Sequence, residues 1–113
     1  MIFLPGIRSL QFIILFYIIP INSYSQKQAN YWFFGEMAGL NFNSGSPVVV
    51  TGALMAVGGG AAISDSIGNL MFYSNGEKIW DKTNQIMTNG DGLYGNDASA
   101  QAALIVPKPG SKT

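Results

Sequence analysis

The sequence NLMFYSNGEKIWDK, residues 69–82, contains the clearest folding signal in the chain. Asn75-Gly76 separates two apolar and aromatic runs, and this dipeptide favours the positive φ angles of a tight type I′ turn. We therefore predict a β-hairpin with a two-residue loop, in which alternate side chains share a face. The facing pairs that this loop predicts are Ser74 with Glu77, Tyr73 with Lys78, Phe72 with Ile79 and Met71 with Trp80.

A third strand is predicted just upstream, in the run AAIS at residues 61–64. Between this run and the hairpin lies DSIGN, residues 65–69, whose Asp, Gly and Asn are typical turn formers. The three runs together predict an antiparallel meander from Ala61 to Trp80.

The rest of the chain after residue 25 also favours strands over helices. Apolar residues do not recur at three- and four-residue spacing there, and Gly, Asn, Ser and Asp interrupt the sequence every few residues. Short apolar or aromatic runs between turn residues are typical of strands. Strands are predicted at residues 31–34, 40–42, 48–51, 61–64, 70–74, 78–80 and 102–106.

Some of these runs do not alternate apolar with polar residues, notably YWFF at 31–34, LMFY at 70–73 and ALIV at 103–106. Such strands need cover on both faces, and in a protein without helices other sheets must provide it. Stacked blades meet this need because each small meander is covered by its neighbours. We therefore predict an all-β fold of antiparallel, β-propeller-blade type, with residues 26–113 forming a partial propeller of about one to two blades.

The first 25 residues differ in kind from the rest. Arg8 is their only charge, and the apolar core at residues 12–19 is much shorter than the roughly 20 residues that span a bilayer as a helix. Pro20 ends this core, and small residues at Ser23 and Ser25 suit a signal peptidase. We predict a signal-peptide helix over residues 1–25 that is removed before Gln26; a retained anchor or a buried helix is the alternative interpretation.

The composition excludes several classes of protein. Lipid attachment at the processing site requires a cysteine, and the chain has none. Basic and acidic residues number six each, and no arginine follows the leader, so the charge expected of a nucleic-acid binder is missing. The chain also has no histidine, which removes the commonest general base and, with cysteine absent too, most transition-metal sites. We predict no catalytic residue, no cofactor and no metal.

Carboxylates are the remaining candidates for catalysis, because a pair of them can serve a glycosidase. The candidates are Asp65, Asp81, Asp91 and Asp97. Each lies among Gly, Asn and Ser residues, so we interpret them as turn formers that bond their own backbone. The run SDSIG at residues 64–68 is not a sialidase Asp-box, because its Asp is one place early and no Trp follows.

Two further features have competing interpretations. In the loop NGDGLYGND, residues 89–97, oxygen atoms of Asn89, Asp91, Asn96 and Asp97 could bind calcium, but successive tight turns explain the same residues equally well. Trp32 and Trp80 could stack on sugars, but their strand positions favour packing in the core.

The chain also resembles a known family. The stretches YWFFGEMAGLNFNSGSPV, AAISDSIGNLMFYSNGEKIWDKTNQIM and GLYGNDASAQAALIVPKPGS are similar to the amino-terminal propeller-like region of large Bacteroidetes surface proteins. The most distinctive residues are Asp65, Gly68-Asn69-Leu70, Phe72-Tyr73, Trp80, Asn84 and 101–109. The triple glycine at 58–60 departs from the family, where a more polar turn is expected. Members often continue into PKD repeats and end in a gliding-motility-associated, type IX secretion sorting domain. Neither follows in this sequence, so the resemblance implies a fragment, a truncated reading frame or a degenerate copy.

From these observations we expect a non-enzymatic module, secreted or held at the outer cell surface, with a structural or interaction role. The resemblance links it to adhesion, gliding or polymer capture. The expected partners are missing downstream blades, other surface proteins or extracellular polysaccharide, with no nucleic acid and with membrane contact only through the leader during export. The first alternative is a fragment of an extracellular carbohydrate-active enzyme or of a glycan-binding propeller, and the second is an orphan fragment with no independent function.

Overall fold

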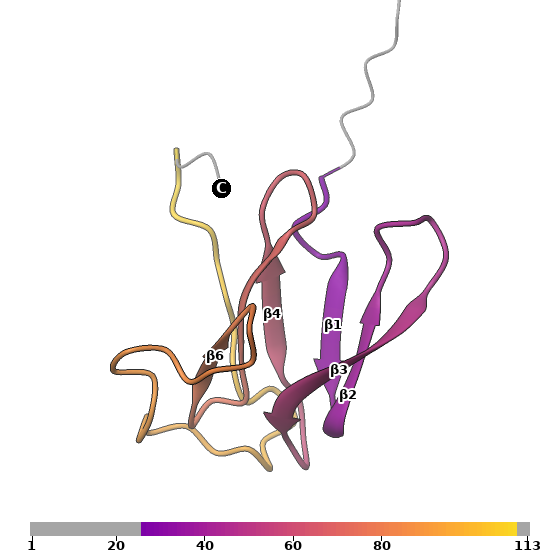
Figure 1. Cartoon of the computed structure of the whole chain (residues 1–113). Helices are drawn as coiled ribbons and strands as arrows, with labels where there is room; N and C mark the ends of the chain where they lie inside the picture. The colour runs from indigo at the N-terminus through magenta and orange to yellow at the C-terminus, as the bar shows by residue number, and fades with distance from the viewer. Residues whose placement is uncertain (1–25, 111–113) are drawn as a thin grey trace, which may run out of the picture.

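The computed structural model describes residues 26–110, and in this part of the chain it contains six strands and no helix (Figure 1). Sheet A has the order β1–β2–β3 and sheet B the order β4–β5–β6, and all neighbouring strands are antiparallel. The strands are β1 (Tyr31–Phe34), β2 (Glu36–Asn41), β3 (Val48–Met55), β4 (Ala61–Ser64), β5 (Leu70–Ser74) and β6 (Ile79–Asp81). The all-β prediction is confirmed, while the predicted leader at 1–25 lies outside the described residues.

Sheet A is longer than the sequence pattern predicted, because its strands run through glycines. Gly39 in β2 and Gly52 in β3 are both buried beneath the ring of Phe33. A Cβ atom at Gly39 would lie 2.7 Å from the Phe33 ring, and one at Gly52 would lie 2.6 Å from it. These glycines therefore make room for an aromatic side chain, whereas sequence reasoning treated them as interruptions.

Sheet B is the predicted meander, but its hairpin register differs by two residues from the prediction. Tyr73 faces Trp80 and Ser74 faces Ile79, so a four-residue connection replaces the predicted type I′ turn. Asn75 causes the difference: its Oδ1 accepts hydrogen bonds from the backbone N–H groups of Glu77 (3.0 Å) and Lys78 (2.9 Å). Only Gly76 in this connection has a positive φ, of 91°. Because the shift is an even number of residues, each side chain keeps its predicted face.

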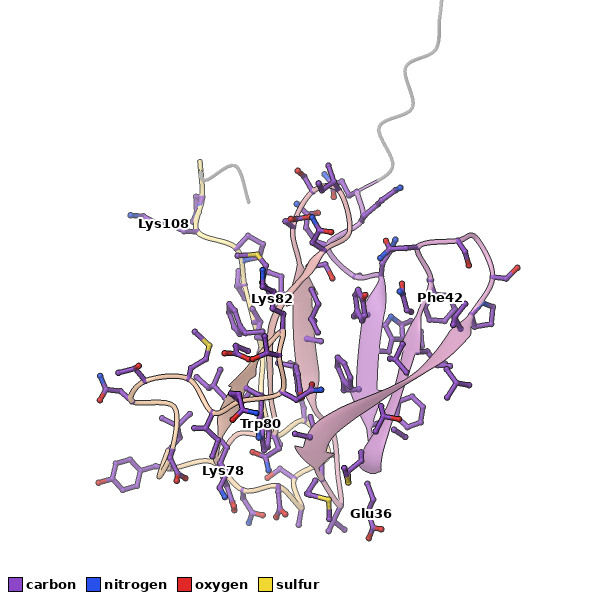
Figure 2. All side chains as sticks on the ribbon, viewed as in Figure 1. Glu36, Phe42, Lys78, Trp80, Lys82 and Lys108 are labelled. Carbon is purple, nitrogen blue, oxygen red and sulfur yellow. The ribbon has the colours of Figure 1, made fainter. Side chains whose placement is uncertain are left out.

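The two sheets meet through a stack of aromatic rings. The Phe33 and Tyr73 ring centroids are 4.2 Å apart, and those of Tyr73 and Trp80 are 5.5 Å apart. Leu54 from β3 is fully buried against the same cluster. Figure 2 shows Trp80 near the centre of the molecule, so the predicted core role of this tryptophan is confirmed.

The predicted strand at residues 102–106 is wrong: this segment runs past sheet B without entering a ladder (Figure 1). The chain just before it is fixed by backbone hydrogen bonds from Gly58 to Asp97 (2.8 Å) and from Gly59 to Ser99 (3.0 Å). A Cβ atom at either glycine would collide with this passing backbone. The triple glycine therefore allows a close backbone crossing, and residues 102–106 continue beyond it without a strand partner among the described residues.

Candidate interaction surface

Sheet A has one face that sheet B does not cover, and we call it the outer face. It follows from the strand register, because residues directly opposite each other point to the same side. Trp32 faces Leu40, Phe34 faces Ala38, and β3 adds Val49 opposite Leu40 and Thr51 opposite Ala38. The outer face consists of Trp32, Phe34, Ala38, Leu40, Phe42, Val49 and Thr51.

The outer face is apolar and open. Trp32 is 56% exposed, Phe34 45% and Val49 81%, whereas Phe33 on the inner face of the same sheet is only 7% exposed. None of the outer-face residues carries a charge, and Glu36 lies at the far end of the sheet from Phe42 (Figure 2). Contiguous exposed apolar surface on a protein is typical of an interaction site.

Trp32 is held in place on this face. Its Nε1–H donates to the backbone carbonyl of Ala29 at 2.9 Å, and its ring lies 5.2 Å from that of Phe42. The one polar group of the side chain is therefore satisfied within the chain, and the exposed part is hydrocarbon. A hollow of about 380 Å³ beside Trp32 and Phe34 also reaches Gly59, Gly60 and Ala62 between β1 and β4.

The predicted core role of Trp32 is wrong, and the reason is its position in β1. All four residues of YWFF are aromatic, so the sequence gives no sign of which pair faces sheet B. The structure turns Tyr31 and Phe33 inward and leaves Trp32 and Phe34 outside. Sequence reasoning thus missed the members of the outer face as a group, although the lack of polar alternation was their signal.

Between the sheets lies a second concave region, a cleft of about 1090 Å³. Two of the predicted candidate carboxylates, Asp65 and Asp81, are in its lining, together with Tyr31, Val50, Thr51, Met71, Phe72, Lys82, Thr83, Asn84 and others. Both carboxylates accept hydrogen bonds from the turns that they begin.

Asp65 caps the β4–β5 turn. Its Oδ1 accepts from the backbone N–H groups of Ile67 (3.0 Å) and Asn69 (2.9 Å), and its Oδ2 accepts from the Asn69 side chain (3.0 Å). The bond from the Asn69 backbone contributes most to lowering the pKa of Asp65 below its usual value. The prediction that Asp65 is a turn former is confirmed.

Asp81 does the same after β6. Its Oδ1 accepts from the hydroxyl of Thr83 (2.6 Å) and from the backbone N–H groups of Thr83 (2.8 Å) and Gln85 (3.1 Å). The Thr83 hydroxyl is the main cause of a lowered pKa for Asp81. The fourth residue of each turn has a positive φ, 96° at Gly68 and 64° at Asn84, so the two turns are built alike.

The loop at residues 89–97 is a series of turns. Asp91 accepts a hydrogen bond from the next backbone N–H at 2.8 Å, and Asn96 Oδ1 accepts from the N–H of Ala98 at 2.9 Å. Asn89 and Gly92 have positive φ angles of 60° and 68°. Nowhere in residues 26–110 do three or more acidic, His or Cys side chains gather closely enough to hold a metal ion, so the calcium hypothesis gains no geometric support.

No helix within the described range is long and apolar enough to cross a membrane. Comparison of the chain with protein-family models, with curated proteins and with solved structures gave no match.

Proposed function

We propose that this chain is an exported structural or interaction module of the cell envelope, and that a further β-sheet covers the outer face of sheet A. The main support for this proposal is the outer face, where Trp32, Phe34 and Val49 are exposed and no residue is charged. Burying apolar surface stabilises an interface by roughly 25 cal/mol per Å². Large aromatic side chains contribute most to this term.

A sheet suits this face better than a small ligand does. The outer face is made of alternate residues from three paired strands, so it extends across the sheet. Stacked sheets pack face to face at roughly 10 Å with their side chains interdigitated. Sheets A and B already meet through stacked aromatic rings, with Phe33 of sheet A against Tyr73 of sheet B and Trp80 beyond it. Repeating that packing on the outer face would give a series of stacked, blade-like sheets, and this supports the partial-propeller interpretation.

Export and family membership complete the proposal. The apolar segment at residues 12–19 with small residues at Ser23 and Ser25 supports removal of a leader before Gln26. The resemblance to Bacteroidetes surface proteins supports a role in adhesion, gliding or polymer capture at the outer cell surface. Type IX secretion and a continuation into further blades belong to the same proposal, which includes no catalytic activity.

Hydroxyl-radical footprinting of the exported protein tests this proposal. The chain is labelled once in its natural setting on or outside the producing cell, and once after purification and dilution. We expect Trp32 and Phe34 to react severalfold more slowly in the natural setting, because a covering sheet excludes water from them. Tyr94, which is fully exposed on the 89–97 loop, is the internal control and should react equally in both. Equal labelling of Trp32 in the two samples would contradict the proposal.

A mature amino terminus at Gln26, read by mass spectrometry of the same exported sample, is the expected result for the leader. A chain that retains residues 1–25 outside the cell would refute cleavage at that site.

A further inference from the structure

The free edge of β3 is divided into two halves that differ in their hydrogen bonding. Along this strand the odd-numbered residues direct their backbone N–H and C=O groups away from β2. In the half nearer the end of β3, at Ala53 and Met55, the N–H of Ala53 donates to the hydroxyl of Tyr73 at 2.8 Å, and the carbonyl of Met55 accepts from Nδ2 of Asn75 at 2.8 Å. Tyr73 of β5 and Asn75 of the β5–β6 connection therefore bind two of the outward groups in this part of the edge.

In the half nearer the start of β3, at Val49 and Thr51, the outward backbone groups have no hydrogen-bond partner within residues 26–110. Val49 and Thr51 direct their N–H and C=O groups outward in the same way. The strand reads VVVTGALM and contains none of the charged residues that commonly protect an edge from pairing. Val50 and Thr51 also line the inter-sheet cleft, so there is space beside this half of the strand. An unpaired, uncharged edge of this kind is a template for one more strand.

The same chain contains a segment whose backbone groups also lack hydrogen-bond partners within residues 26–110. This segment is AALIV, residues 102–106. Leu104 is 73% exposed and Val106 70% exposed, although both are large and apolar. The segment is uncharged, and Pro107 ends it. Its apolar residues on both sides favour a strand that is covered on both faces.

We propose that residues 102–106 of one copy add as an antiparallel strand to the Val49–Thr51 edge of a second copy. Figure 1 shows residues 102–106 on the sheet B side of the molecule, with the Val48 end of β3 on the opposite side, so the segment cannot reach this edge in its own copy without crossing the molecule. Val49 and Thr51 each offer one donor and one acceptor, which an antiparallel partner satisfies in pairs.

Side-chain chemistry allows the pairing in either of its two registers. Alternate residues of the added strand would point to the outer face beside Val49, and the others to the cleft beside Val50. Both environments are mainly apolar, and residues 102–106 are apolar throughout. Because donor and acceptor are different parts of the molecule, each copy can give one strand and receive one, which produces rings or open chains of copies.

A peptide with the sequence of residues 101–108, QAALIVPK, is the probe for this proposal. Labelled with a fluorophore and titrated with the full chain, it should bind saturably with a midpoint below about 1 mM, measured by fluorescence anisotropy. Thr51→Pro removes the outward N–H without touching the bonds to β2, and proline is tolerated at such edge positions. We expect Thr51→Pro to weaken binding at least tenfold, while Thr51→Val, which keeps the N–H, binds like the native chain.

Self-association of the full chain provides the second readout. Sedimentation velocity should show assembly that grows with concentration and is reversed by excess peptide. Leu104→Pro, introduced into the full chain or into the peptide, should abolish strand donation without altering either sheet. Near-UV circular dichroism from the Tyr73 and Trp80 stack reports whether each variant keeps its fold.

Absence of saturable binding, or binding that Thr51→Pro and Leu104→Pro both leave unchanged, would overturn strand donation. The footprinting of Trp32 concerns the outer face and not the edge, so the two proposals can fail separately.

Discussion

The inner and outer faces of sheet A differ in environment far more than in residue type. Phe33 and Phe34 are adjacent phenylalanines in β1, yet Phe33 stacks 4.2 Å from Tyr73 while Phe34 is 45% exposed. The strand alternation sends them to opposite sides, and sheet B occupies only one of those sides. A run of aromatic residues in a strand therefore indicates that both faces need cover, while the position of the neighbouring sheet decides which residues are buried.

Truncation of Phe33 and of Phe34 to alanine should give the largest difference in stability between the two faces. Phe33→Ala removes the ring between Gly39, Gly52 and Tyr73, which should cost about 3–5 kcal/mol of unfolding free energy. Phe34→Ala should change the isolated chain by no more than about 0.5 kcal/mol, because its ring lies at the surface. Urea denaturation monitored by circular dichroism measures both, and equal losses would show that the two faces are not distinct.

Enlarging a β2 side chain should distinguish the same two faces, with a smaller loss of stability. Gly39→Ala places a Cβ atom 2.7 Å from the Phe33 ring and should destabilise the chain by about 1–3 kcal/mol through overpacking. Ala38→Val enlarges the neighbouring side chain on the outer face and should stay within about 0.5 kcal/mol. The midpoints of thermal unfolding provide the comparison, and a tolerated Gly39→Ala would mean that Phe33 does not fill this site.

Removal of a single hydroxyl tests the contact between the inner face and the β3 edge. The Tyr73 hydroxyl accepts from Ala53 and donates to Asn84 Oδ1 at 2.6 Å, so Tyr73→Phe should cost about 1–2 kcal/mol. The control is Tyr94→Phe, which changes an exposed side chain and should be neutral in the same denaturation experiment. A Tyr73→Phe chain as stable as the native one would show that the hydroxyl does not hold this half of the edge.

The same tyrosine predicts a response to alkaline pH. Burial raises the pKa of Tyr73 above its usual value of 10.0. The folded chain therefore holds this proton more tightly than the unfolded chain, and the associated stability is complete below pH 10.0 and is lost as pH rises through the folded pKa. In Tyr73→Phe the decline of the unfolding midpoint above pH 10.0 should be weaker.

The smallest effect is expected at the exposed turns, outside both faces. Hydrogen bonds from Thr83 and Gln85 lower the pKa of Asp81 below 3.8, so its contribution to stability is present above pH 3.8 and is lost as pH falls through the folded value. Asp81→Asn should reduce the acid dependence of the unfolding midpoint without changing the Tyr73–Trp80 stack. An unchanged acid profile would indicate that the turn forms without the carboxylate.

The sequence predicted sheet B better than sheet A, for identifiable reasons. The runs at 61–64 and 70–74 lie between strong turn residues, and Asp65 and Asp81 hold their turns as expected from local chemistry. The hairpin register was missed because Asn75 bonds two following N–H groups, and the dipeptide Asn-Gly gives no sign of this choice. Sheet A was predicted too short because Gly39 and Gly52 have a reason to lie in strands only when the Phe33 ring is above them.

From the sequence one can predict that β1 needs cover on both faces, but not which of its residues form the uncovered outer face. The run YWFF indicated that β1 requires cover on both sides, but the sequence did not say that Trp32 and Phe34 form the side without it. The edge of β3 could not be predicted at all, because its division depends on Tyr73 and Asn75, which reach it from the other sheet.

Local sequence and composition are enough to predict most of the strands, the aspartate-capped turns and the absence of histidine and cysteine chemistry, because each depends on neighbouring residues or on composition. Only the tertiary structure settles which aromatic side chains are buried, which half of the β3 edge receives hydrogen bonds from Tyr73 and Asn75, and that residues 102–106 have no strand partner within residues 26–110. These outcomes depend on contacts between residues far apart in the chain, and hydrophobic burial and backbone hydrogen bonding specify that partners are required without specifying which partners they are.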